Sequence, residues 1–61
     1  MLTVAYYNLG VEYEFIGDLN EAIHSITQAI TISKNHLGTN HPLYRKIEES
    51  KKKLIDKRKL N

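Results

Sequence analysis

Cysteine and tryptophan are absent from this 61-residue chain, proline occurs once and glycine three times. Without cysteine there can be no disulfide, which excludes the small disulfide-rich secreted folds. No apolar run approaches the roughly 20 residues that cross a bilayer, and the N-terminal stretch lacks the basic start of a signal peptide. We therefore expect a soluble, cytoplasmic protein.

Positive charge is also missing from the first half of the chain. Residues 1–33 contain four acidic residues and no Lys or Arg, whereas residues 34–61 contain nine basic and three acidic residues. The resulting charges of −4 and +6 would favour head-to-tail contact between copies, or contact of the basic end with an anionic surface. Because so short a chain buries a small core, we expect further protein to stabilise it, either a longer parent chain or another copy.

The spacing of apolar residues predicts three helices and no strand, which is an all-α fold. The expected helices span 3–16, 18–37 and 42–58 and form a single module. The first two should pair as an antiparallel hairpin. The third has a narrow apolar stripe and is otherwise basic, so we expect it to cap the hairpin and to fray after Ile55.

Residues that start and stop helices support these ranges. Thr3 and Asp18 are suitable N-caps, because their side-chain oxygens can accept from the first free amides of a helix. Glu21 stands where it could complete a capping box with Asp18. Gly17 and Gly38 are suitable helix ends.

Large and small residues alternate through the first two helices at a diagnostic spacing. The pattern is Tyr6-x2-Leu9-Gly10-x2-Tyr13, then Gly17-Asp18, then Ala22-x3-Ile26-x2-Ala29. It resembles the tetratricopeptide repeat, a helical hairpin whose copies stack into a solenoid. The resemblance implies that the large signature residues fill the hairpin interior and that the small ones lie where helices cross.

The end of the second helix departs from the commonest form of that repeat. Lys34 stands where a proline is usual, and the helix continues to Leu37-Gly38-x2-His41-Pro42. This link is similar to that of the longer variant found in kinesin light chains. Where the Leu-Gly of a further repeat would be expected, the chain has Lys51-Lys52, so we expect the third helix to be the polar C-terminal end of a longer array.

The resemblance implies a non-catalytic interaction or scaffold module whose partner is a protein or peptide. In the family, first helices line a concave groove, and the positions that would face it are Val4, Tyr7, Asn8, Val11, Glu14 and Phe15. Two interpretations of their apolar members stay open, namely burial against a preceding repeat or another copy, and contact with a bound peptide. The first helix has no Lys or Arg, so a groove for chaperone C-terminal carboxylates is not expected.

A small basic adaptor that binds nucleic acid or anionic membrane is the alternative function. Its candidate anion-binding residues are Lys51, Lys52, Lys53, Lys57, Arg58 and Lys59. A solvated helix face explains these residues more simply, and Tyr44 is the only aromatic residue after Phe15 that could stack on a base. The sequence therefore does not favour a nucleic acid or membrane partner.

Sites for metal or catalysis find no support in the sequence. His24, His36 and His41 lack the spacing of metal ligands on a shared helix face. The hydroxyl residues form no recognisable catalytic constellation, and the glycines form no phosphate-binding loop. We expect neither an enzyme nor a cofactor.

Overall fold

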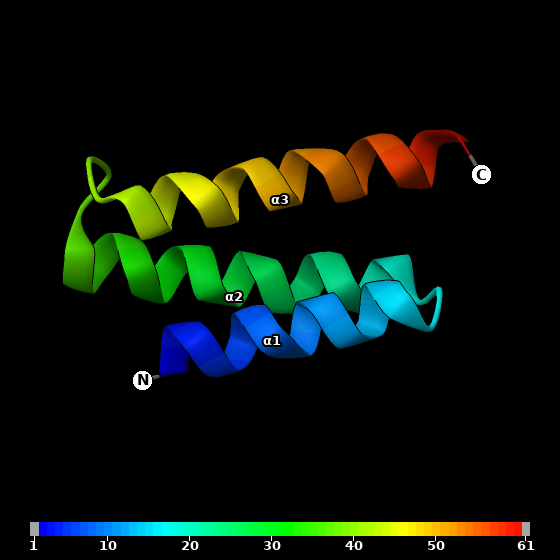
Figure 1. Cartoon of the computed structure of the whole chain (residues 1–61), viewed down its shortest axis with the longest axis horizontal. Helices are drawn as coiled ribbons and strands as arrows, with labels where there is room; N and C mark the ends of the chain where they lie inside the picture. Colours follow the sequence, from blue (N-terminus) through cyan, green and yellow to red (C-terminus); the bar gives the residue numbers. More distant parts are fainter. Residues whose placement is uncertain (1, 61) are drawn as a thin grey trace.

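The computed structural model describes residues 2–60, which form three helices. They are α1 (Leu2–Phe15), α2 (Leu19–Leu37) and α3 (Pro42–Leu60). Each runs antiparallel to the one before it, and α2 lies between α1 and α3 (Figure 1). This confirms the expected all-α fold.

A tight turn joins α1 to α2. Gly17 adopts a positive φ of 88°, which a residue without Cβ tolerates best. The backbone amides of Gly17 and Asp18 donate to the carbonyls of Glu14 (3.0 Å) and Tyr13 (2.9 Å), an arrangement known as the Schellman motif. Asp18 Oδ1 then accepts from the Glu21 amide (3.2 Å), so the expected N-cap is confirmed. Glu21 does not complete a capping box, because the Asp18 amide is already bonded to Tyr13.

The hairpin is packed closely where small residues face large ones. Ala22 and Ala29 of α2 have no exposed surface, and Ile26 is buried between them. A Cβ atom on Gly10 would lie 2.6 Å from Ile26 Cδ1 and 3.3 Å from the Ala22 carbonyl oxygen. A residue without a side chain therefore fits this crossing best, which agrees with the small residue expected there.

Two expectations for α1 are wrong. Leu9 was expected in the hairpin interior, but 39% of it is exposed because it lies on the flank of α1 that α2 leaves uncovered. Thr3 was expected to cap the helix, but α1 already begins at Leu2 and the Thr3 side chain is buried. The hydroxyls of Thr3 and Ser33 are both buried without a hydrogen-bond partner among the described residues.

The link between α2 and α3 likewise ends one helix and caps the start of the next. Gly38 has a φ of 82°, and its amide donates to the Lys34 carbonyl at 3.2 Å. His41 then serves as the N-cap of α3, because its Nδ1 accepts from the Leu43 amide at 3.1 Å. Pro42 occupies the first position of α3, where the missing N–H is not needed.

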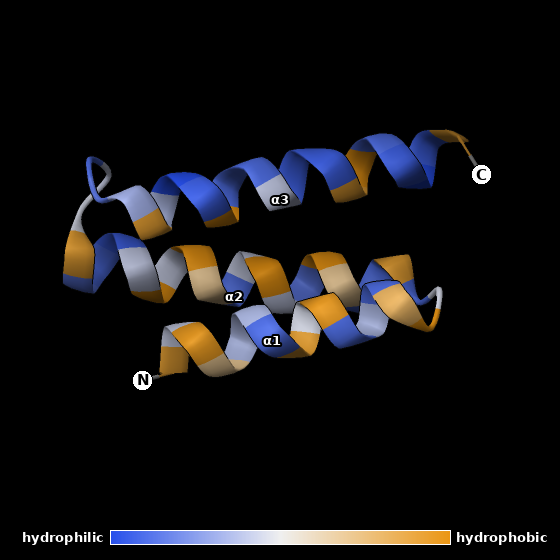
Figure 2. Cartoon of the chain, viewed as in Figure 1, coloured by the Kyte–Doolittle hydropathy of each residue, from blue (hydrophilic) through white to orange (hydrophobic). Residues whose placement is uncertain are grey.

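The third helix packs on α2 along one edge. Its buried residues are Tyr44, Ile47 and Leu54, and the remainder is mostly hydrophilic (Figure 2). The helix continues to Leu60 and does not fray after Ile55. A single apolar edge covered by α2 is therefore enough to support the whole length of α3.

Candidate functional site

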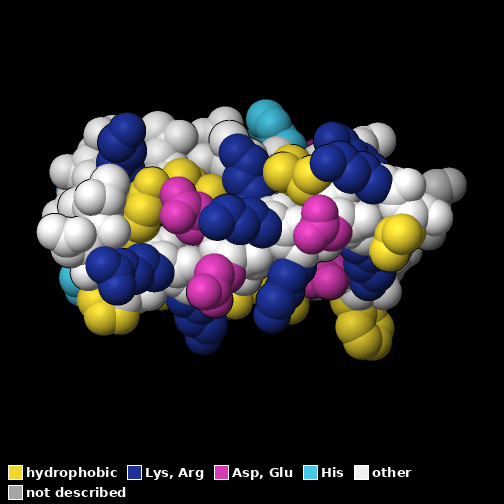
Figure 3. Space-filling view, turned by 90° about the horizontal axis from the view of Figure 1, so that it is seen from above, with side chains coloured by type: hydrophobic (Ala, Val, Ile, Leu, Met, Phe, Trp, Pro, Cys, Tyr) yellow, Lys and Arg dark blue, Asp and Glu magenta, His cyan; other side chains and the backbone are white. Residues whose placement is uncertain are grey.

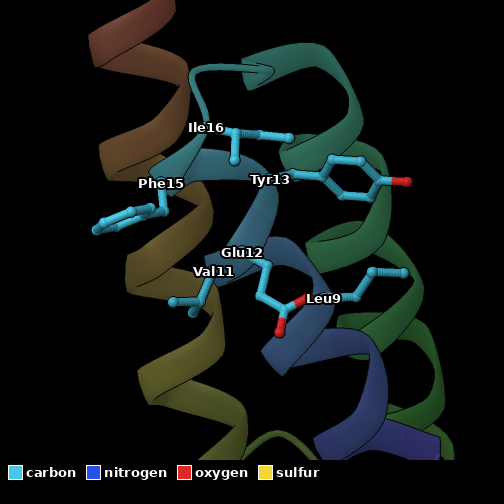
Figure 4. Close-up of a pocket in the computed structure, with 6 residues that line it drawn as sticks. All are labelled: Leu9, Val11, Glu12, Tyr13, Phe15 and Ile16. Carbon is cyan, nitrogen blue, oxygen red and sulfur yellow. The ribbon is translucent and has the colours of Figure 1, made fainter.

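Apolar side chains lie on two flanks of α1, and Glu12 lies between them. The first flank, here called the inner face, lies beside α3. It consists of Val4, Tyr7, Asn8, Val11, Glu14 and Phe15. The second, here called the outer face, lies on the other flank. It consists of Leu2, Tyr6, Leu9, Tyr13 and Ile16, the last from the turn after α1. An open pocket on α1 is lined by residues of both flanks, namely Leu9, Val11, Glu12, Tyr13, Phe15 and Ile16. Figure 4 shows Val11 and Phe15 directed towards α3, and Leu9 and Tyr13 directed away from it.

Two pairs of side chains connect the inner face to α3. The Lys46 Nζ atom lies 5.8 Å from the centroid of the Tyr7 ring, within the range of a cation–π contact. Lys57 Nζ lies 3.6 Å from Glu14 Oε2 in a solvent-accessible ion pair. The inner face therefore forms one wall of a groove, and α3 forms the other.

The groove contains an open hollow lined by both apolar and charged residues. Val11, Glu14, Phe15 and Lys57 together line this hollow between α1 and α3. Phe15 is 91% exposed and Val11 is 46% exposed, although both are large hydrophobic residues. Asn8 is also exposed, at the edge of the groove. The arrangement can bury an apolar side chain of a ligand next to a cation.

Two of the six candidate anion-binding residues already have partners in the structure. Lys57 is paired with Glu14, and Arg58 donates to Asn20 Oδ1 at 3.2 Å. Lys51 is partly buried beside Ile30 of α2. The remaining three, Lys52, Lys53 and Lys59, are exposed. Acidic side chains lie among the basic ones over the surface formed by α3, which lowers its attraction for phosphates (Figure 3).

One titratable group is perturbed within α3. The Tyr44 hydroxyl donates to Glu48 Oε2 at 3.1 Å. This hydrogen bond is the main reason why the pKa of Tyr44 is raised, with partial desolvation and the Glu48 charge acting in the same direction. Because the two residues are one turn apart, the bond is internal to the helix.

The described residues contain neither a metal-binding cluster nor a membrane-spanning helix. Within residues 2–60, no three His, Cys, Asp or Glu side chains are placed to hold a metal ion. None of the three described helices combines the length and the apolar character needed to cross a bilayer.

The helical hairpin of α1 and α2 is similar to a known family of repeats. A family model described as tetratricopeptide repeat matches residues 3–36. The chain belongs to the tetratricopeptide repeat family. No curated protein and no solved structure gives a significant match. The match covers α1 and nearly all of α2, whereas α3 lies beyond it.

Tetratricopeptide repeats are generally protein-interaction modules, and this indicates the class of function to expect. The outer face was not singled out as a site in the sequence, although a signal for it exists. Leu2, Leu9 and Ile16 recur every seven residues, and Tyr6 and Tyr13 follow Leu2 and Leu9 by four. Such alternating spacings of four and three place all five on one stripe of a helix.

Proposed function

We propose that the chain is a non-catalytic protein-interaction module that binds a peptide or protein segment in the groove between α1 and α3. The observation that carries this proposal is the exposure of Phe15, a large aromatic residue, in a hollow that Val11, Glu14 and Lys57 also line. Burying a Phe side chain on binding contributes about 1.5–3 kcal/mol. The groove therefore suits a ligand with an apolar anchor.

The second part of the proposal concerns the place of this unit in an array. The outer surface of α3 is hydrophilic, and Leu60 is its only exposed large apolar side chain within residues 2–60. Such a surface is typical of the terminal helix of a repeat array. We propose that α3 is the C-terminal end of such an array. We also propose that the link through Gly38 and Pro42 is that of the longer, kinesin-light-chain-like variant of the repeat. The outer face of α1 would then contact a neighbouring unit, which is either a preceding repeat or another copy.

A peptide library displayed on phage provides the test. Peptides selected on the chain should be titrated by fluorescence anisotropy against the wild type and Phe15→Ala. We expect Phe15→Ala to raise the dissociation constant of the peptide at least tenfold, because the apolar anchor of the peptide loses the aromatic ring against which it packs. Ile16→Ala is the matched control, since Ile16 is also exposed and apolar but lies on the outer face. Equal affinity of the wild type and Phe15→Ala for every selected peptide would contradict the proposal.

The alternative, a basic adaptor, makes the opposite prediction. Replacing Lys51, Lys52 and Lys53 by Gln should change peptide affinity by less than about twofold, because exposed charges contribute little to short-range contacts. Binding to phosphates would instead weaken steeply between low and physiological salt. Tight, salt-sensitive binding to a DNA duplex or to phosphatidylserine vesicles, lost in the triple variant, would favour the alternative.

A further inference from the structure

We infer that the outer face of α1 is a two-fold interface between two copies of this chain. The inference rests on the proposed function in one respect. The proposed function left the neighbouring unit open, and the inference identifies that unit as a second copy. The remaining argument concerns the surface itself. Tyr6 and Tyr13 pack partly against the core, whereas Leu2, Leu9 and Ile16 are exposed with no covering element among the described residues.

The exposed hydrophobic surface of the chain is concentrated on α1 and the turn that follows it. Leu2 is 66% exposed and Ile16 is 72% exposed, with Leu9 midway between them. Beside Leu2 the surface continues onto α2, where Ile32 and Leu37 line an adjoining hollow. The outer face therefore presents a continuous strip of exposed apolar side chains that a partner could cover.

Head-to-tail stacking of copies does not match this surface. It would place the outer face of one copy against the outer surface of α3 in the next. That surface carries charged residues such as Arg45, Glu49, Lys52 and Asp56, all of them exposed. Apolar side chains would then cover charges and remove them from water, which is unfavourable. Within residues 2–60, the surface that best complements the outer face is the outer face of a second copy.

The charges on α1 favour an antiparallel pairing of the two α1 helices. Glu12 and Glu14, its only charged residues, both lie near its C-terminal end. Glu14 is directed to the inner face and pairs with Lys57, so a parallel pair would bring the two Glu12 carboxylates together. In an antiparallel pair each Glu12 lies near the N-terminal half of the partner helix, which has no charged side chain and has the positive end of the helix dipole. Because Leu9 is the central residue of the stripe, maximal overlap places it at the two-fold axis, with Leu2 opposite Ile16.

Sedimentation velocity of the full chain at about 50 µM is the first test. We expect a dimer, and we expect Leu9→Arg to raise its dissociation constant at least tenfold because the substituted residue meets its own copy at the axis. Phe15→Arg is the matched control. It introduces the same charge at an exposed position of α1, but on the inner face, and should leave the dimer intact. A monomeric wild type, or a dimer lost in Phe15→Arg and kept in Leu9→Arg, overturns the inference.

A second measurement avoids the possibility that Leu9→Arg unfolds the chain. The chain has no cysteine, so single cysteines report contacts without background. With oxidised glutathione, Leu9→Cys should form a disulfide-linked dimer, and Lys53→Cys on the exposed side of α3 should not. Cross-linking only in a mixture of the two variants would indicate head-to-tail stacking and would overturn the two-fold arrangement. Peptide affinity measured on the same Leu9→Cys sample tests the groove separately, so either proposal can fail alone.

Discussion

Gly10→Ala is the substitution whose effect can be worked out most directly from the structure. The new Cβ would lie 2.6 Å and 2.7 Å from Ile26 Cδ1 and Cγ1. Carbon atoms in contact are normally about 3.5–4.0 Å apart, so Ile26 would have to move by roughly 1 Å. Ile26 is buried, and overpacking a core of this kind costs about 1–3 kcal/mol. Alanine gains about 1 kcal/mol over glycine in helix propensity, so the net loss of stability should be about 1 kcal/mol.

A double-mutant cycle separates the two contributions. In an Ile26→Ala background both colliding atoms are gone, and Gly10→Ala should then stabilise the chain by about 1 kcal/mol through propensity alone. Stabilities can be measured by urea unfolding followed by circular dichroism, at one protein concentration and with trimethylamine N-oxide present to keep the weakened variants folded. If Gly10→Ala has the same sign in both backgrounds, the close crossing of α1 and α2 at Ile26 is refuted.

Three further substitutions test separate features. Ala29→Leu should overpack the buried side of α2 and lower the free energy of unfolding by about 1–3 kcal/mol, whereas Thr31→Leu on its exposed side should change it by less than about 0.5 kcal/mol. Asp18→Ala should cost about 1 kcal/mol through loss of the cap, and Asp18→Asn should restore most of it. The raised pKa of Tyr44 means that the folded state holds this proton more tightly than the unfolded state. The stabilisation is therefore complete at neutral pH and is lost as the pH rises above about 10, and this part of the pH dependence should disappear in Tyr44→Phe when urea unfolding is compared from about pH 8 to about pH 11.

Local signals predicted the turns and the hairpin well. The cap at Asp18 and the helix end at Gly17 depend on residues within one turn of each other, so the sequence contains all that determines them. The crossing at Gly10 was equally predictable, because a small residue opposite a large one allows the two helices of a hairpin to pack closely.

Longer-range relations were predicted less well. The exposure of Leu9 depends on whether another element covers that flank of α1, and the spacing within α1 cannot say whether such an element is present. The assignment of Thr3 as a cap failed because a helix start moved by one residue turns a side chain by about 100°. The contacts of Glu14 and Tyr7 with α3 depend on how α3 lies against α2, which no pattern within a single helix encodes.

The central position of α2 determines how the groove responds to a ligand. Both α1 and α3 pack on α2, while α1 and α3 contact each other through few residues. A small roll of α3 about α2 would widen the groove and leave the α1–α2 packing untouched. Its main penalty would be separation of the Glu14–Lys57 and Tyr7–Lys46 pairs, each worth no more than about 1 kcal/mol at an exposed site. If the groove binds a ligand as proposed, it would accommodate ligands of different width by a change in the spacing of its walls. Amide hydrogen exchange should then be slowest in α2, the one described helix that packs against both of the others.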